Sequence, residues 1–362
     1  MMTLRERMTS VYRNQQPDKP ALGIYTRYFK RGHMERAARN AGMGIIDYIA
    51  LTSQLGPPWH MIPEFVSRIE GAEMCVKIYY DHGVRKERRL FTTPAGEIYA
   101  DVGASIGEGS EHISKYYVNS PEDYAVMKYI VEHTVFSRNE AVFQKRRDDL
   151  GEDGVVLGRL DRNPYQKLMM ELVGAENFLL DLYTDPEPAL EVLHAMEKRM
   201  DEQFALALES QAELLWMPDN VSADMTPPES FEKYLLPYYQ KCARLAHQAG
   251  KRVIAHFDGK FAPLAGIIRD SGIDVIESVS DPSIGGDVTY AKARELFPEM
   301  VILPNFPANL ALRPQEEIHA FVAAIFGSAE GKPFMLQVSE DLDESAYPYA
   351  LPILAEAMSR LG

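Results

Sequence analysis

The chain alternates between short apolar runs and longer amphipathic segments from about Gly154 to its end. The apolar runs are rich in Val, Ile, Leu and Phe and lack polar alternation, which is typical of strands buried on both faces. Six of them are predicted strands: VVLGRL (155–160), LLWMPD (214–219), RVIAHFD (252–258), DVIESVS (274–280), MVILPNF (300–306) and PFMLQVS (333–339). Two earlier runs, ALGIYTR (21–27) and GIIDYIAL (44–51), bring the number of predicted strands to eight.

The amphipathic segments between these runs predict helices. They comprise residues 186–210, 228–250, 261–272, 288–297, 314–327 and 346–362. Successive strand–helix units predict a parallel sheet with right-handed crossovers. A doubly wound sheet is one alternative, but no GxGxxG or GxxxxGK[ST] motif follows any of the strands. We therefore predict a TIM-type (β/α)8 barrel, a fold in which one domain can contain 362 residues.

Residues 73–103 interrupt this pattern. They alternate in polarity, and the turn signals DHG (81–83) and PAG (94–96) divide them into three segments. Such a pattern is typical of an antiparallel meander, which we interpret as an insertion over one end of the barrel. The chain has no internal repeat and no low-complexity linker, so we expect one domain over residues 1–362.

Composition narrows the range of partners and compartments. The formal net charge of −15 repels phosphate backbones and anionic lipids, so neither nucleic acid nor a membrane is an expected partner. The only two cysteines, Cys75 and Cys242, have no partner pattern, which favours a reducing compartment. The charged N-terminus is no signal peptide, and no run of 18 apolar residues occurs, so we expect a cytoplasmic protein. Helical arms such as residues 121–150 could support a homodimer.

The candidate chemistry lies where the predicted strands end, because (β/α)8-barrel enzymes carry their catalytic groups there. His256 and Asp258 are two residues apart on one strand, so their side chains point the same way while Phe257 points to the other face. Asp219 and Glu340 follow two other strands. One imidazole with two or three carboxylates suits Zn²⁺, and also Fe²⁺ or Mn²⁺, and an open coordination position would allow Lewis-acid catalysis.

Two alternatives remain open at this point. His256 could be a hydrogen-bonded barrel histidine in a metal-free polar site, and Asp219 and Asp258 could be helix N-caps. The candidates for substrate binding are Arg27, Tyr25, Trp216, Arg162 and Asn305. An arginine could anchor a substrate carboxylate, and the aromatic side chains could line a pocket.

The segment from PESFEKYLLPYYQKCARLAHQAG through KRVIAHFDG to GIDVIESV (228–279), with PDN (218–220) before it, resembles the uroporphyrinogen decarboxylase-like superfamily. The resemblance is clear over roughly residues 200–300 and implies a barrel of the kind predicted above. In addition, TTPAGEIYAD (92–101) is similar to a hairpin of the corrinoid-dependent methyltransferase branch.

The resemblance offers three functional branches. Decarboxylases bind substrate carboxylates through an N-terminal Met-Arg-Gln-Ala-Gly-Arg segment, whereas this chain has YTRYFKR (25–31) and too little positive charge for an octacarboxylate. Thiol-methylating members bind zinc through His-x-Cys and a distant Cys, whereas this chain has His256-Phe257-Asp258. Substrate:corrinoid methyltransferases use oxygen-rich zinc sites, and Asp219, His256, Asp258 and Glu340 fit that branch best.

The third branch implies a specific activity. The protein would demethylate a small methyl donor, with a methoxylated aromatic as the expected donor, and pass the methyl group to the Co(I) corrinoid of a partner protein. His256, Asp258 and Asp219 would hold Zn²⁺, and the metal or a protonated Glu340 would stabilise the developing phenolate. The alternatives are a uroporphyrinogen decarboxylase or a non-catalytic binding barrel, which would show no perturbed titration at its strand-end acids.

Overall fold

The computed structural model describes residues 1–26, 36, 39–57, 67–104, 111–340, 342–343 and 345–361. The chain forms two compact units. The first comprises Met1–Ile49, Ala141–Arg159 and Gln211–Gly362, and the second comprises Ala50–Glu140 and Leu160–Ser210.

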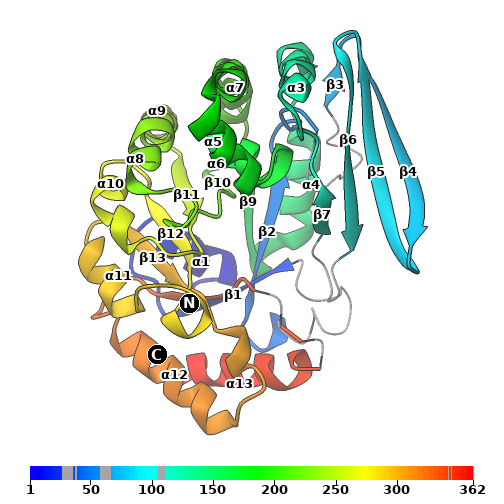
Figure 1. Cartoon of the computed structure of the whole chain (residues 1–362). Helices are drawn as coiled ribbons and strands as arrows, with labels where there is room; N and C mark the ends of the chain where they lie inside the picture. The colour runs from blue at the N-terminus through cyan, green and yellow to red at the C-terminus, as the bar shows by residue number, and fades with distance from the viewer. Residues whose placement is uncertain are drawn as a thin grey trace. The chain divides into compact units, whose positions relative to one another are not determined.

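The first unit is built on a parallel eight-stranded sheet. Its strands in chain order are β1 (Ala21–Tyr25), β2 (Gly44–Ala50), β9 (Gly154–Arg159), β10 (Leu214–Met217), β11 (Arg252–His256), β12 (Val275–Val279), β13 (Val301–Pro304) and β14 (Met335–Val338). The order in the sheet is β13-β12-β11-β10-β9-β2-β1-β14, so each strand lies beside its predecessor, and an Asn305–Gln337 bridge joins the two ends. The result is a nearly closed TIM-type (β/α)8 barrel, which confirms the predicted fold and all eight predicted strands (Figure 1).

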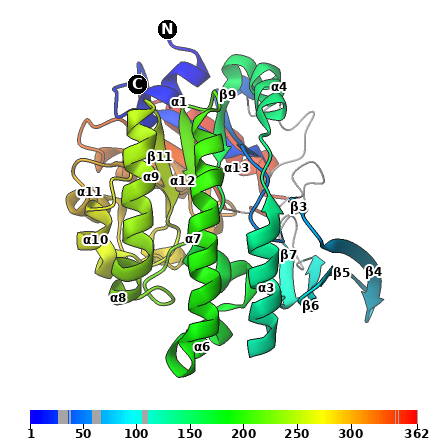
Figure 2. The same cartoon turned by 90° about the horizontal axis from the view of Figure 1, so that it is seen from above.

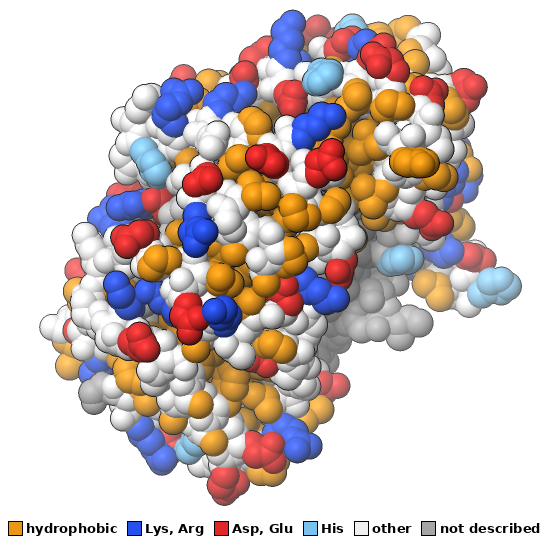
Figure 3. All heavy atoms as spheres, turned by 60° about the vertical axis from the view of Figure 1, so that its left-hand side comes forward, with side chains coloured by type: hydrophobic (Ala, Val, Ile, Leu, Met, Phe, Trp, Pro, Cys, Tyr) orange, Lys and Arg blue, Asp and Glu red, His pale blue; other side chains and the backbone are white. Residues whose placement is uncertain are grey.

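Helices of the first unit lie around this sheet (Figures 1 and 2). They are α1 (Leu4–Tyr12), α4 (Glu140–Leu150), α8 (Pro228–Ser230), α9 (Leu236–Gln248), α10 (Ala265–Arg269), α11 (Tyr290–Leu296), α12 (Gln315–Gly327) and α13 (Tyr347–Ser359). Their apolar stripes cover strands that are buried on both faces, which explains why the strands lack polar alternation. The face in Figure 3 shows acidic, basic and apolar side chains interspersed, so the net charge does not gather there into one acidic patch.

Helix α1 is an element that the apolar pattern does not reveal. It begins with a capping box, in which Thr3 Oγ1 accepts from the backbone N–H of Glu6 and the Glu6 carboxylate accepts from that of Thr3. Only Met8, Val11 and Tyr12 are buried, and the helix packs against β1 and β9. Because Gln337 Nε2 of β14 donates to the Tyr12 hydroxyl at 3.4 Å, α1 also reaches the last strand.

The second unit contains the predicted meander with one strand more than expected. Its strands are β4 (Glu73–Asp81), β5 (Val84–Thr93), β6 (Gly96–Ala104) and the additional β7 (Glu111–Lys115). His82 and Gly83 connect β4 to β5 with φ of 48° and 82°, as a type I′ hairpin turn requires. A two-stranded sheet of β3 (Arg68–Ile69) and β8 (Thr134–Val135) accompanies the meander.

The helices of the second unit are α3 (Pro121–His133), α5 (Pro164–Lys167), α6 (Ala175–Thr184) and α7 (Pro186–Leu208). Helix α3 packs against α7 and against β6 of the meander. Within the described ranges of the chain, no helix has both the length and the apolar composition that crossing a membrane requires.

Candidate active site

Neighbouring strands bring polar side chains to the carboxyl-terminal end of the barrel. Strand β10 leads into Asp219, β11 ends at His256, and β12 carries Glu277. The parallel register places His256 and Glu277 side by side on adjacent strands. Since the carboxyl ends of parallel strands share one edge, this is the position at which barrel enzymes carry out their chemistry.

The imidazole of His256 lies between two carboxylates. Its Nδ1 is 2.8 Å from Oε1 of Glu277, and its Nε2 is 3.4 Å from Oδ2 of Asp258. Glu277 is fully buried, whereas the side chain of Asp258 is 33% exposed. The Nε2 side of the ring therefore faces the more open part of the site, and the Nδ1 side faces the barrel interior.

Two further donors satisfy the buried Glu277. The hydroxyl of Tyr25, on β1, donates to the carboxylate at 2.5 and 2.6 Å, and the indole N–H of Trp216, on β10, donates to Oε1. A buried carboxylate is tolerated only where hydrogen bonds and an opposite charge replace its hydration. Glu277 is thus a shared hydrogen-bond acceptor that holds the imidazole and both aromatic side chains in place.

The carboxylates set the charge of the histidine. Burial would lower the pKa of His256, but Asp258 and Glu277 outweigh burial and raise the pKa to about 9. Burial would also raise the pKa of Asp258, but the charge of His256 and the amide of Asn220, which donates at 2.7 Å, hold it below its ordinary value. At neutral pH the site therefore contains an imidazolium beside an ionised aspartate.

Backbone strain accompanies this arrangement. Asn220 and Ser278 adopt φ of 51° and 62°, in the left-handed region that non-glycine residues rarely occupy. Asn220 donates its backbone N–H to the carbonyl of His256, and Ser278 lies where the β12–β13 register shifts next to Glu277. Strained residues of this kind concentrate at functional sites, because the surrounding structure must hold them there.

The other candidates from the sequence lie at the same barrel end but have separate partners. Asp219 is fully buried and accepts a hydrogen bond from the Tyr239 hydroxyl at 2.6 Å. Ser280 donates to Glu340 at 3.2 Å, and Asn305 accepts from both the backbone and the hydroxyl of Ser339. Burial, reinforced by the charge of Asp258, raises the pKa of Glu340, so this carboxyl is the more readily protonated acid of the site.

Helix capping does not account for the two aspartates. The turn after β11 starts at Ala262, and its first backbone N–H groups donate to Asp287, not to Asp258. Helix α8, which follows Asp219, has Pro227 at its N-cap position. Both aspartates therefore belong to the polar network and not to helix ends.

The arginine candidates differ in position. Arg27 lies outside the described residues. Arg162 belongs to the second unit, where its Nε lies 2.7 Å from Glu171. Glu171 also binds the buried Lys167, which contacts Asp161 at 2.8 Å. Arg162 is therefore part of a buried ion-pair cluster.

The polar network does not fit a metal ion in its present arrangement. His256 directs both ring nitrogens to carboxylates, and Asp219 is bound to Tyr239. Among the described residues, no group of three or more His, Cys, Asp or Glu side chains is placed to hold a metal. Zinc therefore stays a prediction from the sequence, and we derive no step through it.

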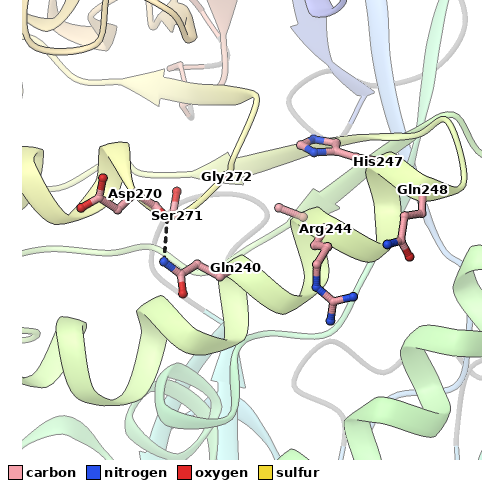
Figure 4. A pocket seen from close by; sticks show the side chains of 8 residues that line it. Gln240, Arg244, His247, Gln248, Asp270, Ser271 and Gly272 are labelled. Atoms are coloured by element: carbon pink, nitrogen blue, oxygen red, sulfur yellow. Dashed lines mark hydrogen bonds between the residues drawn. The ribbon is translucent and has the colours of Figure 1, made fainter.

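A second candidate for a binding site is an open groove on the outside of the barrel (Figure 4). Side chains of α9, including Gln240, Arg244 and His247, line it together with the segment around Asp270. Gln240 donates to the backbone carbonyl of Asp270 at 2.9 Å. None of these residues contributes to the strand-end network, so we place the chemistry at the network and not in this groove.

Gly259 allows the loop after β11 to approach the loop after β10 closely. A Cβ at this position would lie 2.5 Å from Cβ of Ser222 and 2.9 Å from the carbonyl of Val221. We expect Gly259→Ala to displace the loop that carries Asn220. Steady-state kinetics should then show a kcat for the reaction at this site that is lower by roughly 10- to 100-fold. Gly266→Ala is the matched control, because its Cβ would meet nothing closer than 4.0 Å. Equal kcat in both variants would show that the close approach of the loops is not required.

Glu277 lies on one of the predicted strands, but sequence reasoning gave it no role in the site. It is the one charged side chain inside the apolar run VIESV, and a carboxylate in a strand buried on both faces must have a partner. That signal was available, but the identity of the partners was not. Tyr25 and Trp216, proposed only as pocket aromatics, prove to be hydrogen-bond donors to it.

The fold and the strand-end network are those of a (β/α)8-barrel enzyme. Residues 166–359, more than half of the chain, match the family described as uroporphyrinogen decarboxylase (URO-D). The chain therefore belongs to the uroporphyrinogen decarboxylase family. No curated protein matches its sequence.

The chain is also similar to proteins of solved structure. A methyltransferase from Methanosarcina mazei is 13% identical, with a TM-score of 0.60 and 99% of each chain covered. A glycoside hydrolase family 5 enzyme from Prevotella bryantii B14 is 10% identical, with a TM-score of 0.45, over 100% of this chain and 99% of its own. At such identities, the likeness to the methyltransferase demonstrates a shared fold.

Proposed function

We propose that the protein is a methyltransferase that moves a methyl group from a small methylated substrate, with a methoxylated aromatic as the expected donor, to the Co(I) corrinoid of a partner protein. One observation carries the proposal: a buried imidazolium, His256, is held between Glu277 and Asp258 at the catalytic end of the barrel. The structural likeness to a methyltransferase and the resemblance of residues 92–101 to the corrinoid-dependent branch support it.

The chemistry needs a proton at the leaving group. Methyl aryl ethers are inert because phenolate is a poor leaving group, so an acid at the ether oxygen accelerates cleavage. The partner's corrinoid supplies the nucleophile that accepts the methyl group. As the carbon–oxygen bond breaks, its electron pair stays on oxygen and takes the proton of His256.

The geometry supports a different role for each nitrogen of His256. The contact of Nε2 with Asp258 is 3.4 Å, longer than the 2.8 Å contact of Nδ1 with Glu277. Nε2 is therefore the nitrogen that can donate to a substrate, while Glu277 orients the ring. Glu340, with its raised pKa, is the second acid of the site and can return a proton after product release.

Decarboxylation of uroporphyrinogen is the second candidate, and the family match favours it. The charge of the site opposes it, because within the described residues Asp258, Glu277 and Glu340 pair with no Lys or Arg. A substrate with many carboxylates would meet like charges there. The perturbed pKa values of His256, Asp258 and Glu340 favour either enzyme over a non-catalytic binding barrel.

Two assays separate these candidates. Purified protein is incubated with reduced cobalamin and a series of methoxylated aromatic acids, and cobalamin methylation is followed by its absorbance. In parallel, release of carbon dioxide from uroporphyrinogen is measured. Methyl transfer alone supports the proposal. Carbon dioxide release without methyl transfer from any donor contradicts it.

Treatment with a chelator tests the acid-assisted mechanism against the zinc prediction. Because His256 supplies the proton and no step needs a metal, we expect chelator-treated, dialysed protein to transfer methyl groups at the rate of untreated protein. Metal content of both samples is measured as the control. A loss of activity that added Zn²⁺ restores would contradict the acid-assisted mechanism and support the zinc site.

A further inference from the structure

Tyr48, on β2, is an aromatic side chain whose direction follows from its neighbour in the strand. The side chain of Asp47 is buried on the outer face of the sheet, where its carboxylate contacts Arg146 of α4 at 3.1 Å. Successive side chains of a strand point to opposite faces. Tyr48 therefore points into the barrel.

The register between β1 and β2 sets the position of Tyr48 along the barrel axis. Tyr25, the last residue of β1, lies beside Ile46 of β2. Tyr48 is two residues beyond Ile46, so it shares the inner face with both and lies nearer to the carboxyl-terminal end of the barrel. Barrel enzymes bind their substrates at that end.

Tyr48 forms an aromatic cluster with Tyr25 and Trp216. Its ring centroid lies 4.9 Å from that of Trp216 at an interplanar angle of 32°, and it meets the Tyr25 ring edge-on at 5.8 Å. Tyr25 and Trp216 both donate hydrogen bonds to Glu277. The Trp216 ring also meets the His256 ring edge-on at 5.8 Å. The rings that support Tyr48 are therefore held by the same carboxylate that orients the histidine.

The three rings differ in how accessible they are. Tyr25 and Trp216 are only 1% and 6% exposed, whereas Tyr48 is half-buried. Aromatic rings attract one another in offset-stacked and edge-on arrangements, and this attraction adds to the burial of their area. Within this cluster, Tyr48 thus presents ring surface against which a further planar ring can stack, and a saturated ring has no π-system to match it.

We propose that Tyr48 is a specificity-determining residue for the methyl donor and stacks on the aromatic ring that carries the methoxy group. This inference rests on the proposed function and adds the side chain that selects the class of substrate. Tyr48 contacts the ring of the donor and not its methoxy group. It therefore discriminates between methyl aryl ethers and saturated methyl ethers without a part in proton transfer.

Binding of two uncharged methyl ethers, anisole and methoxycyclohexane, tests the proposal without any methyl acceptor. The two compounds have the same heavy-atom skeleton, and only anisole is aromatic. Calorimetry should show that the wild-type protein binds anisole about 3- to 10-fold more tightly, the contribution expected of one aromatic pair. Tyr48→Leu, which keeps an apolar side chain without a ring, should bind both ethers equally.

Two further variants serve as controls. Tyr48→Phe keeps the ring and should retain the preference for anisole. Tyr183→Leu removes a ring that is 89% exposed on α6 and should also retain it. Circular dichroism spectra and urea denaturation check that each variant is folded. A wild-type protein that binds both ethers equally, or a folded Tyr48→Leu variant that still prefers anisole, overturns the inference.

Kinetics separate this inference from the proposed function. Because Tyr48 binds the ring equally in the ground state and in the transition state, Tyr48→Leu should raise KM for anisole about 3- to 10-fold and leave kcat near the wild-type value. Methyl transfer to reduced cobalamin with an unchanged KM in Tyr48→Leu would refute the ring contact alone. A Tyr48-dependent preference for anisole in a protein that never methylates cobalamin would support the ring contact and refute methyl transfer.

Discussion

Replacement of His256 by alanine is expected to lower the rate of methyl transfer to reduced cobalamin by about 10²- to 10⁴-fold, the usual contribution of a positioned general acid. The variant removes the imidazolium that lies between Glu277 and Asp258 and carries a proton at neutral pH. The rate is measured from cobalamin absorbance with a methoxylated aromatic donor.

The control for this variant is His247→Ala. His247 lies on α9, outside the barrel, where it contacts Asp274 at 2.9 Å and contributes nothing to the strand-end network. It should retain the wild-type rate. If His256→Ala also retained that rate, His256 would have no part in the mechanism.

The second large effect is expected at Glu277, because this buried carboxylate satisfies three donors. Its removal in Glu277→Ala leaves the His256 charge and the donors of Tyr25 and Trp216 without their acceptor. Breaking a buried ion pair in this way costs about 3–5 kcal/mol. Urea denaturation measures the free energy of unfolding. The exposed Glu299→Ala is the control and should unfold as the wild type does.

The conservative variant Glu277→Gln separates positioning from stability. The acid form of His256 is present below its pKa of about 9, so the wild-type rate should fall as the pH rises through that value. An uncharged amide at position 277 stabilises the imidazolium less, so the decline should begin at lower pH. A purely structural role of Glu277 would lower the amount of folded protein without moving the pH profile.

The barrel could be predicted because its signal is local. Eight apolar runs without polar alternation reflect strands buried on both faces, and the segments between them have helical periodicity. The sequence predicted that His256 and Asp258 share a side because residues two apart on a strand do so. Strand β11 ends at His256, so Asp258 lies just beyond the strand, and its 3.4 Å contact with His256 depends on the loop that follows.

The remainder of the site depends on register between strands, which no local pattern contains. Glu277 lies opposite His256 only because β11 and β12 pair as they do. Tyr25 reaches the same carboxylate from a strand 252 residues away. The sequence did not predict the hydrogen bond between Tyr239 and Asp219 either. Tyr239 lies on α9, and the apolar pattern of this helix indicated only packing.

The 252-residue span between Tyr25 and Glu277 has a consequence for how the enzyme acquires its chemistry. Contacts between segments so distant along a chain form late in folding, because the entropy of closing the intervening loop must first be overcome. During synthesis, Tyr25 of β1 cannot form its hydrogen bond to Glu277 until the ribosome has produced β12. We therefore expect nascent or truncated chains that end before β12 to lack the oriented histidine, however much helix and sheet they already contain.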